Sequence, residues 1–303
     1  MPDNPAWPSL VWEQWKDTAD TLHMWTQIVG HTRLALCAPL NHWWHVTLYV
    51  TPRGLTTSSI PYGSETFDVE FDFIDHRLVI RHGSGTIKLL PLRAQSVAAF
   101  YREYMDALAS LGIRVKIHAI PDEVADPIPF AEDTVHASYD PDAAHRFWRI
   151  LMQSAEVFKQ FQTHWLGKTS PVHFFWGSFD LAVTRFSGRR APERPGADLI
   201  TREAYSHEVI SFGFWPGNGG YGQPAFYAYA APEPEGLIKA VVRPAGAFYS
   251  DERKEFFLNY DHVRGSESPS DAILAFMDST YRAASVNWDN AALERSGPFP
   301  GRR

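Results

Sequence analysis

Two successive stretches of this sequence pass through the same order of hydrophobic periodicities, and that order limits the possible folds most strongly. The first stretch opens with apolar residues at three- or four-residue steps, the spacing of an amphipathic helix: Trp12, Trp15, Ala19, Leu22, Trp25 and Val29. We expect this helix to end at Gly30, because glycine readily adopts the left-handed conformation that closes helices. A second helical pattern is predicted to end at Gly112 in the same way.

Between these two helices the pattern changes to alternation, which is typical of strands. Phe67, Val69, Phe71 and Phe73 alternate with acidic residues, so one face of this strand is expected to be buried and the other wet. Further strands are expected over 42–51, 78–81 and 86–90, with a short one over 113–120 after the second helix.

The second stretch repeats this order of elements. Asp140 followed by Pro141 predicts a helix start, because an aspartate side chain accepts hydrogen bonds from free backbone amides and proline suits the first helical position. Ser268 and Pro269 predict the start of the last helix in the same way. Strands are expected in between, over 172–186, 206–215, 225–230 and 255–260.

The predicted fold class is therefore α+β, with two diverged αββββα copies that form a pseudo-dimer of antiparallel sheets flanked by helices. The first copy covers 1–120 and the second 141–303, with a proline-rich connector over 121–140, and the whole can form one compact domain. We expect a ligand site in the crevice between the copies or above the second sheet. The alternative is a chance likeness between the halves of an ordinary α+β chain.

Composition argues against several classes of function. A net charge of −7 and a pI near 6.0 disfavour a nucleic-acid partner, which normally needs a basic face. The single Cys37 cannot form an internal disulfide, which fits a reducing compartment. No stretch reaches roughly 18 uninterrupted apolar residues, and no signal peptide is recognisable, so we expect a cytoplasmic protein without a membrane span. No motif specifies a cofactor or an oligomeric state.

Two histidines stand at matching places in the proposed copies, since His42 and His173 each precede a pair of aromatic residues. Neutral imidazole is a good metal ligand, so the pair is a candidate metal site if both strands face a shared crevice. The alternative is that each histidine is a hydrogen-bonded structural residue, because no carboxylate with ligand spacing accompanies them.

Asp180 is the preferred candidate for a catalytic group. It lies in a strand otherwise rich in apolar residues, and alternation places Trp176, Ser178 and Thr184 on its face. An acid in such a strand either faces solvent or is held by a partner, and a held acid often has a shifted pKa. His207, on the next strand, is the expected partner for proton transfer, and a structural ion pair is the alternative.

The remaining candidate site residues are aromatic or basic. Five aromatic residues in the predicted strands are expected to line a binding pocket: Trp44, Trp176, Trp215, Tyr227 and Tyr229. Arg189 and Arg190 lie in a long loop over 187–203 and are expected to attract a carboxylate or phosphate, unless they only aid solubility.

The glycine-rich segment over 217–222 satisfies the spacing of a dinucleotide-binding motif. Such a motif opens a helix, whereas here Pro224 leads into another aromatic strand. We therefore predict a hairpin loop in this place.

Several long and compositionally unusual runs resemble a bacterial family that is known only as a domain of unknown function: TLHMWTQIVG, NHWWHVTLYVTPRGLTT, SPVHFFWGSFDLAVTRFSGR, AYSHEV and AFYAYA. The resemblance covers nearly the whole chain. It implies a bacterial cytoplasmic setting, and it brings no reaction, substrate or catalytic residues.

Three functions are consistent with these observations. The first is an enzyme that performs acid–base chemistry, such as hydrolysis, on a small polar or anionic metabolite, with Asp180 and His207 as the proton-transfer groups. The second is a non-catalytic protein that binds a small molecule in an aromatic pocket. The third is an interaction protein that buries its aromatic residues in an interface.

Overall fold

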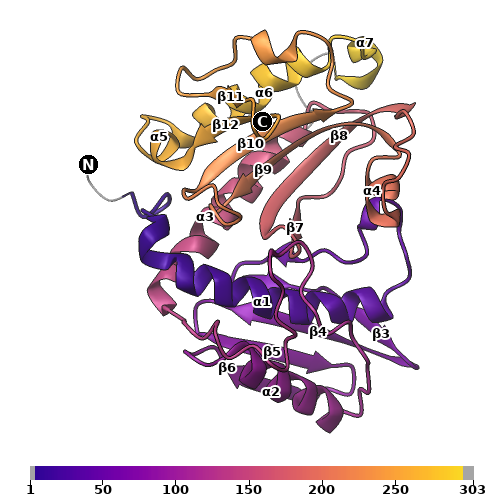
Figure 1. Cartoon of the computed structure of the whole chain (residues 1–303), viewed down its shortest axis with the longest axis vertical. Coiled ribbons are helices and arrows are strands. Elements are labelled where there is room, and N and C mark those ends of the chain that lie inside the picture. Colours follow the sequence, from indigo (N-terminus) through magenta and orange to yellow (C-terminus); the bar gives the residue numbers. More distant parts are fainter. Residues whose placement is uncertain (1–3, 296–303) are drawn as a thin grey trace, which may run out of the picture.

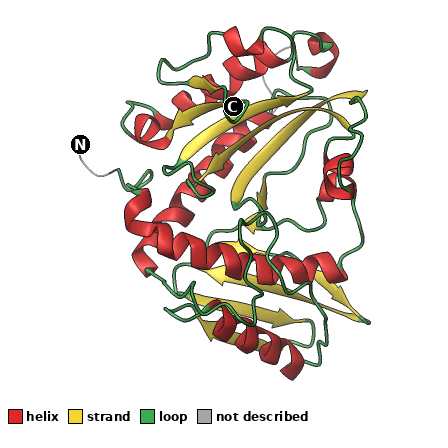
Figure 2. Ribbon diagram, in the orientation of Figure 1, coloured by secondary structure: helices red, strands yellow, loops and turns green. Residues whose placement is uncertain are grey.

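The computed structural model describes residues 4–295, which form two six-stranded antiparallel sheets with helices packed against them (Figures 1 and 2). The elements of the first half are α1 (Trp12–Leu36), the 3₁₀ helix η1 (Asn41–Trp43), β1 (Tyr49–Val50), β2 (Gly54–Thr56), β3 (Ile60–Tyr62), β4 (Glu65–Asp72), β5 (Arg77–His82), β6 (Ile87–Pro91) and α2 (Val97–Ser110). Those of the second half are α3 (Pro141–Gln162), β7 (His173–Phe175), β8 (Asp180–Arg190), α4 (Leu199–Ala204), β9 (His207–Trp215), β10 (Ala225–Ala231), η2 (Leu237–Lys239), β11 (Phe248–Ser250), β12 (Glu255–Asn259), α5 (Tyr260–Arg264), α6 (Pro269–Ala284) and α7 (Asn290–Leu293).

The first sheet has the order β1-β2-β4-β5-β6, with β3 also paired to β4. Phe67, Val69 and Phe71 of β4 are buried, as their alternation predicts. They face the layer formed by α1 and α2, in which the rings of Trp25 and Phe100 stack with centroids 4.6 Å apart. This layer accounts for much of the aromatic content of the first half.

The second sheet has the order β11-β12-β10-β9-β8-β7. One of its faces packs on α3 and α6, for example through Phe161 of α3 against Phe212 of β9, with ring centroids 5.0 Å apart. Arg185 of β8 lies on this face too, where its guanidinium stacks on Phe161 and donates to the Phe161 carbonyl. The helices therefore cover one face of this sheet, and its other face is left for the cleft described below.

Helix α1 lies between the two sheets and is buried on nearly all sides from Thr18 to Arg33 (Figure 1). The prediction that it ends at Gly30 is wrong. Gly30 lies within the helix, and the indole of Trp176 occupies the space where a side chain at this position would be, with Nε1 2.3 Å from an ideal Cβ position. At this place glycine permits close packing and does not end the helix.

Other expectations were met only in part. Each sheet has six strands, where four were expected in each half, and the strand predicted over 113–120 is absent from the described structure, which has irregular backbone there. Asp140 caps α3 as predicted, whereas Ser268 makes no cap hydrogen bond and instead donates to Asp271. The segment 217–222 forms the loop between β9 and β10, in agreement with the predicted hairpin.

The strand expected over 42–51 is mostly wrong, because Asn41–Trp43 forms a 3₁₀ turn in which His42 has a φ of 57°. Only Tyr49–Val50 is a strand. Just before it, Leu48 and Phe174 exchange backbone hydrogen bonds of 2.9 and 2.8 Å, which connect the edges of the two sheets. The halves share the order of helix, antiparallel sheet and helix, and their origin by duplication stays a prediction.

No helix within residues 4–295 is both long and apolar enough to cross a membrane.

Candidate functional site

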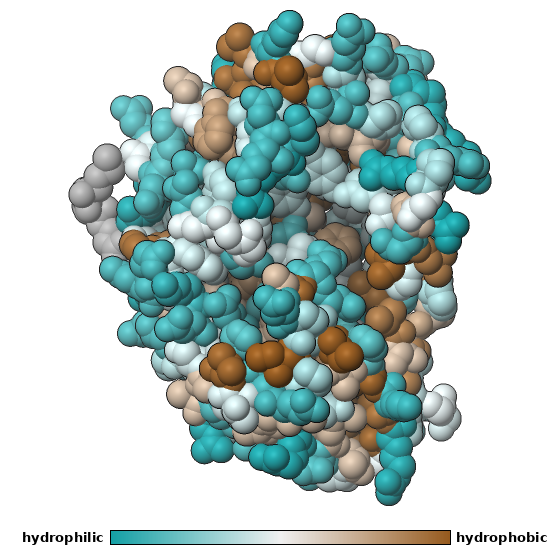
Figure 3. Space-filling view, in the orientation of Figure 1, coloured by the Kyte–Doolittle hydropathy of each residue, from teal (hydrophilic) through white to brown (hydrophobic). Residues whose placement is uncertain are grey.

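A cleft of about 990 Å³ lies over the open face of the second sheet. Its floor comes from β8, β9, β10 and β12, and its walls come from the turn around η1, the connector at Asp122 and Glu123, and helix α4. The space-filling view shows the surface hollowed between the second sheet and α1 (Figure 3). Its size is that of a site for a small organic molecule.

Strand alternation determines which side chains form the floor. The floor residues occupy every second position of their strands: Asp180, Ala182, Thr184, Phe186, Val209, Ser211, Trp215, Tyr227, Tyr229 and Glu255. Thr184 and Ser211 face each other across β8 and β9, and their hydroxyl oxygens are 2.9 Å apart. The floor is thus apolar and aromatic with a few polar groups.

Asp180 lies at one end of this floor and is only 6% exposed. Ser178 donates a hydrogen bond of 2.5 Å to its Oδ1, and the Tyr227 hydroxyl donates to its Oδ2. Burial raises the pKa of Asp180, and these two hydrogen bonds oppose the rise. Asp180 has no ion pair within the described part of the chain, so its charge is not neutralised by any protein cation there.

Two further acids face the same end of the cleft. Burial, followed by the charge of Asp180, raises the pKa of Glu255 to about 7. Glu123 lies at the cleft wall and is exposed as a whole residue. Burial of its carboxyl group, followed by the charge of Asp180, still raises its pKa to about 7. Carboxyl groups with such values take up and release protons near neutral pH.

At the other end of the cleft the lining residue His42 contacts Lys168, which does not itself line the cleft. The His42 Nδ1 donates to the carbonyl of Ala204 at 3.2 Å, so Nε2 is the acceptor for Lys168 Nζ at 2.6 Å. Burial, followed by the charge of Lys168, lowers the pKa of His42. Lys168 also lies 5.1 Å from the Trp44 ring centroid, so this end combines a cation with aromatic faces.

His42 and His173 are both near Trp44, with ring centroids 5.4 and 5.7 Å from that indole. Lys168 already occupies the lone pair of His42 Nε2, and His173 is absent from the cleft lining. Over the part of the chain that the structure describes, no group of three or more His, Cys, Asp or Glu side chains is arranged to hold a metal ion. A site made by these two histidines therefore lacks a third ligand there.

The structure does not bring Asp180 and His207 together. Leu181 pairs with Phe214, so Asp180 lies at the Trp215 end of β9, whereas His207 pairs with Arg190 at the other end. Eight residues of strand separate these ends, which corresponds to roughly 26 Å. The expected acid–base pair is therefore wrong, and the ring of His207 lies 5.8 Å from that of His42.

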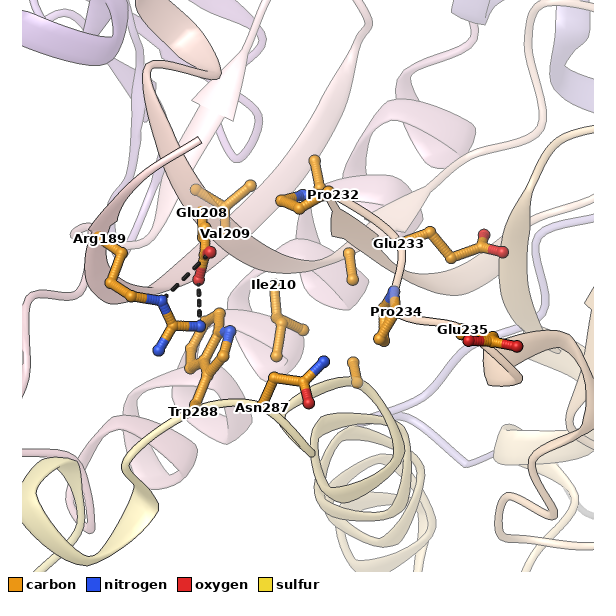
Figure 4. Close-up of a pocket in the computed structure, with 13 residues that line it drawn as sticks. Arg189, Glu208, Val209, Ile210, Pro232, Glu233, Pro234, Glu235, Asn287 and Trp288 are labelled. Atoms are coloured by element: carbon orange, nitrogen blue, oxygen red, sulfur yellow. Dashed lines mark hydrogen bonds and ion pairs between the residues drawn. The ribbon is translucent and has the colours of Figure 1, made fainter. Parts of the chain in front are cut away.

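The predicted basic residues lie elsewhere. Arg189 lines a separate cavity of about 240 Å³, where it forms an ion pair with Glu208 at 2.6 Å (Figure 4). Arg190 is exposed at the end of β8. Neither residue lines the large cleft. All five aromatic residues expected in a pocket do line it: Trp44, Trp176, Trp215, Tyr227 and Tyr229.

Some residues of the cleft were not predicted. Glu255 shares a strand face with Phe257, so alternation within the predicted strand gave a usable signal. Glu123 comes from the connector, about which local sequence says little. Asn218 comes from the loop over 217–222, and its Nδ2 donates to the Ser178 carbonyl at 3.2 Å.

We predict that Tyr227→Phe destabilises the protein by about 1.5–3 kcal/mol at pH 9, the usual loss for a hydrogen bond to a charged group. The lost hydroxyl stabilises the ionised form of Asp180, so the effect should shrink as the pH falls and Asp180 becomes protonated. Urea unfolding at several pH values measures this. Tyr221→Phe is the matched control, because it removes a 2.8 Å bond to the neutral Asn259. Equal, pH-independent losses in both variants would contradict the prediction.

No curated protein and no solved structure matches the chain. Residues 7–295 match the family of unknown function DUF5996, and because this match covers nearly the whole sequence, the chain belongs to that family.

Proposed function

We propose that this protein binds a small organic molecule in the large cleft. The observation that supports the proposal is the combination of an aromatic floor with a few buried polar groups, among them Asp180 and its two hydrogen-bond donors. Apolar walls supply affinity and a few fixed polar groups supply orientation in most small-molecule sites. The predicted anionic ligand fits less well, because six acids and one arginine line the cleft: Asp122, Glu123, Asp180, Asp198, Glu252, Glu255 and Arg253.

A thermal-shift screen with a library of metabolites tests this proposal. A ligand that binds only the native state at roughly 100 times its Kd stabilises that state by about 2.7 kcal/mol, which is readily detected. Thr184→Trp provides the control, because Thr184 is on the cleft floor and an indole there would obstruct a ligand that lies along this floor. We expect hits that stabilise the wild type and lose their effect in Thr184→Trp. Hits that stabilise both proteins equally would place binding outside the cleft.

A second candidate function is acid–base catalysis, which the pKa values of about 7 for Glu255 and Glu123 favour. In this function Glu255, and not His207, is the proton-transfer partner of Asp180. If a screen hit is turned over, the rate should follow a titration near pH 7 that is absent from Glu255→Gln. A pH profile that Glu255→Gln leaves unchanged would exclude this role of Glu255.

A further inference from the structure

At the end of the cleft around Asp180, the side chains have more hydrogen-bond acceptor sites than the protein supplies donors for. Asp180 accepts from Ser178 and Tyr227, and each of its carboxylate oxygens retains a further lone pair. Glu123 and Glu255 add two more carboxyl groups nearby. Acidic residues alone do not specify the class of ligand.

The amide oxygen of Asn218 is a further hydrogen-bond acceptor in the cleft lining. This residue lines the cleft and is only 8% exposed, and its Oδ1 is buried without a hydrogen-bond partner. The orientation of the amide is determined, because Nδ2 donates to the carbonyl of Ser178. A buried acceptor without a donor is unfavourable by about 1–3 kcal/mol, and a ligand N–H can remove this penalty.

Aromatic rings line the cleft floor next to this acceptor-rich end. Trp215, Tyr227 and Tyr229 line the same floor, and the faces of aromatic rings attract cations. We infer that this end of the cleft binds the ammonium or guanidinium group of an organic ligand, whose apolar part extends along the floor toward Trp44 and Phe186. This inference rests on the proposed function and specifies the class of ligand.

One protein cation is close enough to compete. Arg253 lines the cleft, but its guanidinium lies 5.0 Å from the Trp215 ring centroid and donates to the Gly219 carbonyl at 3.3 Å. No ion pair joins it to an acid within residues 4–295. The carboxyl groups are therefore still available to a ligand.

Binding of such a cation is coupled to protons. The charged groups that line the cleft are Asp122, Glu123, Asp180, Asp198, Glu252, Arg253 and Glu255. A ligand cation favours the ionised carboxyl form, so Glu255 and Glu123 lose protons when it binds. Affinity therefore rises with pH between about 6 and 8, a range in which an aliphatic amine keeps its charge.

Four probes with one apolar body and different head groups test the inference: phenylbutylamine, phenylbutyl-trimethylammonium, phenylbutanol and phenylbutyrate. Isothermal titration calorimetry at pH 7 in two buffers of different ionisation enthalpy, phosphate and MOPS, neither of which is a primary amine, gives both affinity and proton release. We expect the amine to bind most tightly, with release of protons. The quaternary ammonium should bind more weakly because it has no N–H to donate.

Asp180→Asn is expected to weaken binding of the amine about tenfold or more, as for loss of a charged hydrogen-bond partner. Glu255→Gln should reduce the proton release. Glu267→Gln, an exposed acid outside the cleft lining, is the matched control and should change neither quantity. Circular dichroism confirms that each variant is folded.

The possible failures are distinguishable. If phenylbutanol or phenylbutyrate binds as tightly as the amine, or if Asp180→Asn has no effect, the inferred cation site is wrong. The proposed function still stands if Thr184→Trp abolishes that binding. If no probe binds, the cation site is also overturned, whereas binding that persists in Thr184→Trp contradicts both.

Discussion

Replacing Gly30 with alanine is expected to destabilise the protein by about 1–3 kcal/mol, the usual loss when a well-packed core is overfilled. The direction is opposite to helix propensity, which favours alanine over glycine by about 1 kcal/mol within a helix. Packing should dominate because the new Cβ would lie 2.3 Å from Trp176 Nε1, and that indole is held in place by its hydrogen bond to the Val46 carbonyl at 2.7 Å.

A double-mutant cycle tests this explanation. In a Trp176→Ala background the space beside Gly30 is free, so Gly30→Ala should be neutral or stabilising in urea unfolding. If Trp176→Ala does not fold, Trp176→Leu can take its place. The same loss from Gly30→Ala in both backgrounds would show that the indole is not the cause.

Glu255→Gln is expected to stabilise the protein at alkaline pH. Folding raises the pKa of Glu255 from 4.5 to about 7, so the folded state binds this proton more tightly than the unfolded state. In the wild type this contribution is fully present below pH 4.5 and is lost as the pH rises through about 7. Glutamine does not titrate, so the variant has no such loss. Relative to pH 4, the unfolding free energy of Glu255→Gln should therefore gain about 3 kcal/mol on that of the wild type by pH 8.

Unfolding measured from pH 4 to pH 9 gives the difference curve for Glu255→Gln. Glu267→Gln again serves as the control, because Glu267 is an exposed acid and its difference curve should be nearly flat. A Glu255→Gln curve without a rise between pH 5 and pH 8 would contradict the burial of this carboxyl group.

Periodicity was sufficient to predict the main elements, because a stripe of apolar residues is needed wherever a helix or strand packs on a core. It failed where a residue served another purpose. Gly30 resembles a helix terminator in the sequence, but the reason for it is an indole more than 140 positions away in the chain. The aromatic run after Asn41 resembles a strand, yet it forms a turn held by contacts of His42 with Ala204 and Lys168.

The cleft residues that could be predicted are those on strands, where alternation gives the direction of each side chain. Asp180 and Thr184 share a face of β8 as alternation predicts, and both line the cleft. The single strand expected over 172–186 is wrong, because a turn over 176–179 divides it into β7 and β8. Trp176 and Ser178 line the cleft from this turn and not from a strand face. The predicted pair of Asp180 and His207 is wrong because it ignored the antiparallel direction of the two strands. Consecutive antiparallel strands place the start of one beside the end of the next, so the start of β8 meets Trp215 and not His207.

Contacts from distant segments could not be predicted in this way. Glu123 reaches the cleft from the irregular connector, and Asn218 reaches it from a glycine-rich loop. Neither segment has a periodicity that gives the direction of a side chain. The feature that distinguishes Asn218 is that its buried amide oxygen has no hydrogen-bond partner. This feature exists only in the folded chain, so the sequence could not show it.

The burial of α1 from Thr18 to Arg33 makes the two halves of the molecule depend on each other for stability. Over residues 18–33 this helix has almost no water-facing side and is enclosed by residues from both halves, and one continuous core runs from Trp7 to Ala284. Neither half alone could cover this helix, so a fragment that ends in the connector would expose it and would tend to aggregate. We therefore expect both sheets to melt together, in one calorimetric transition.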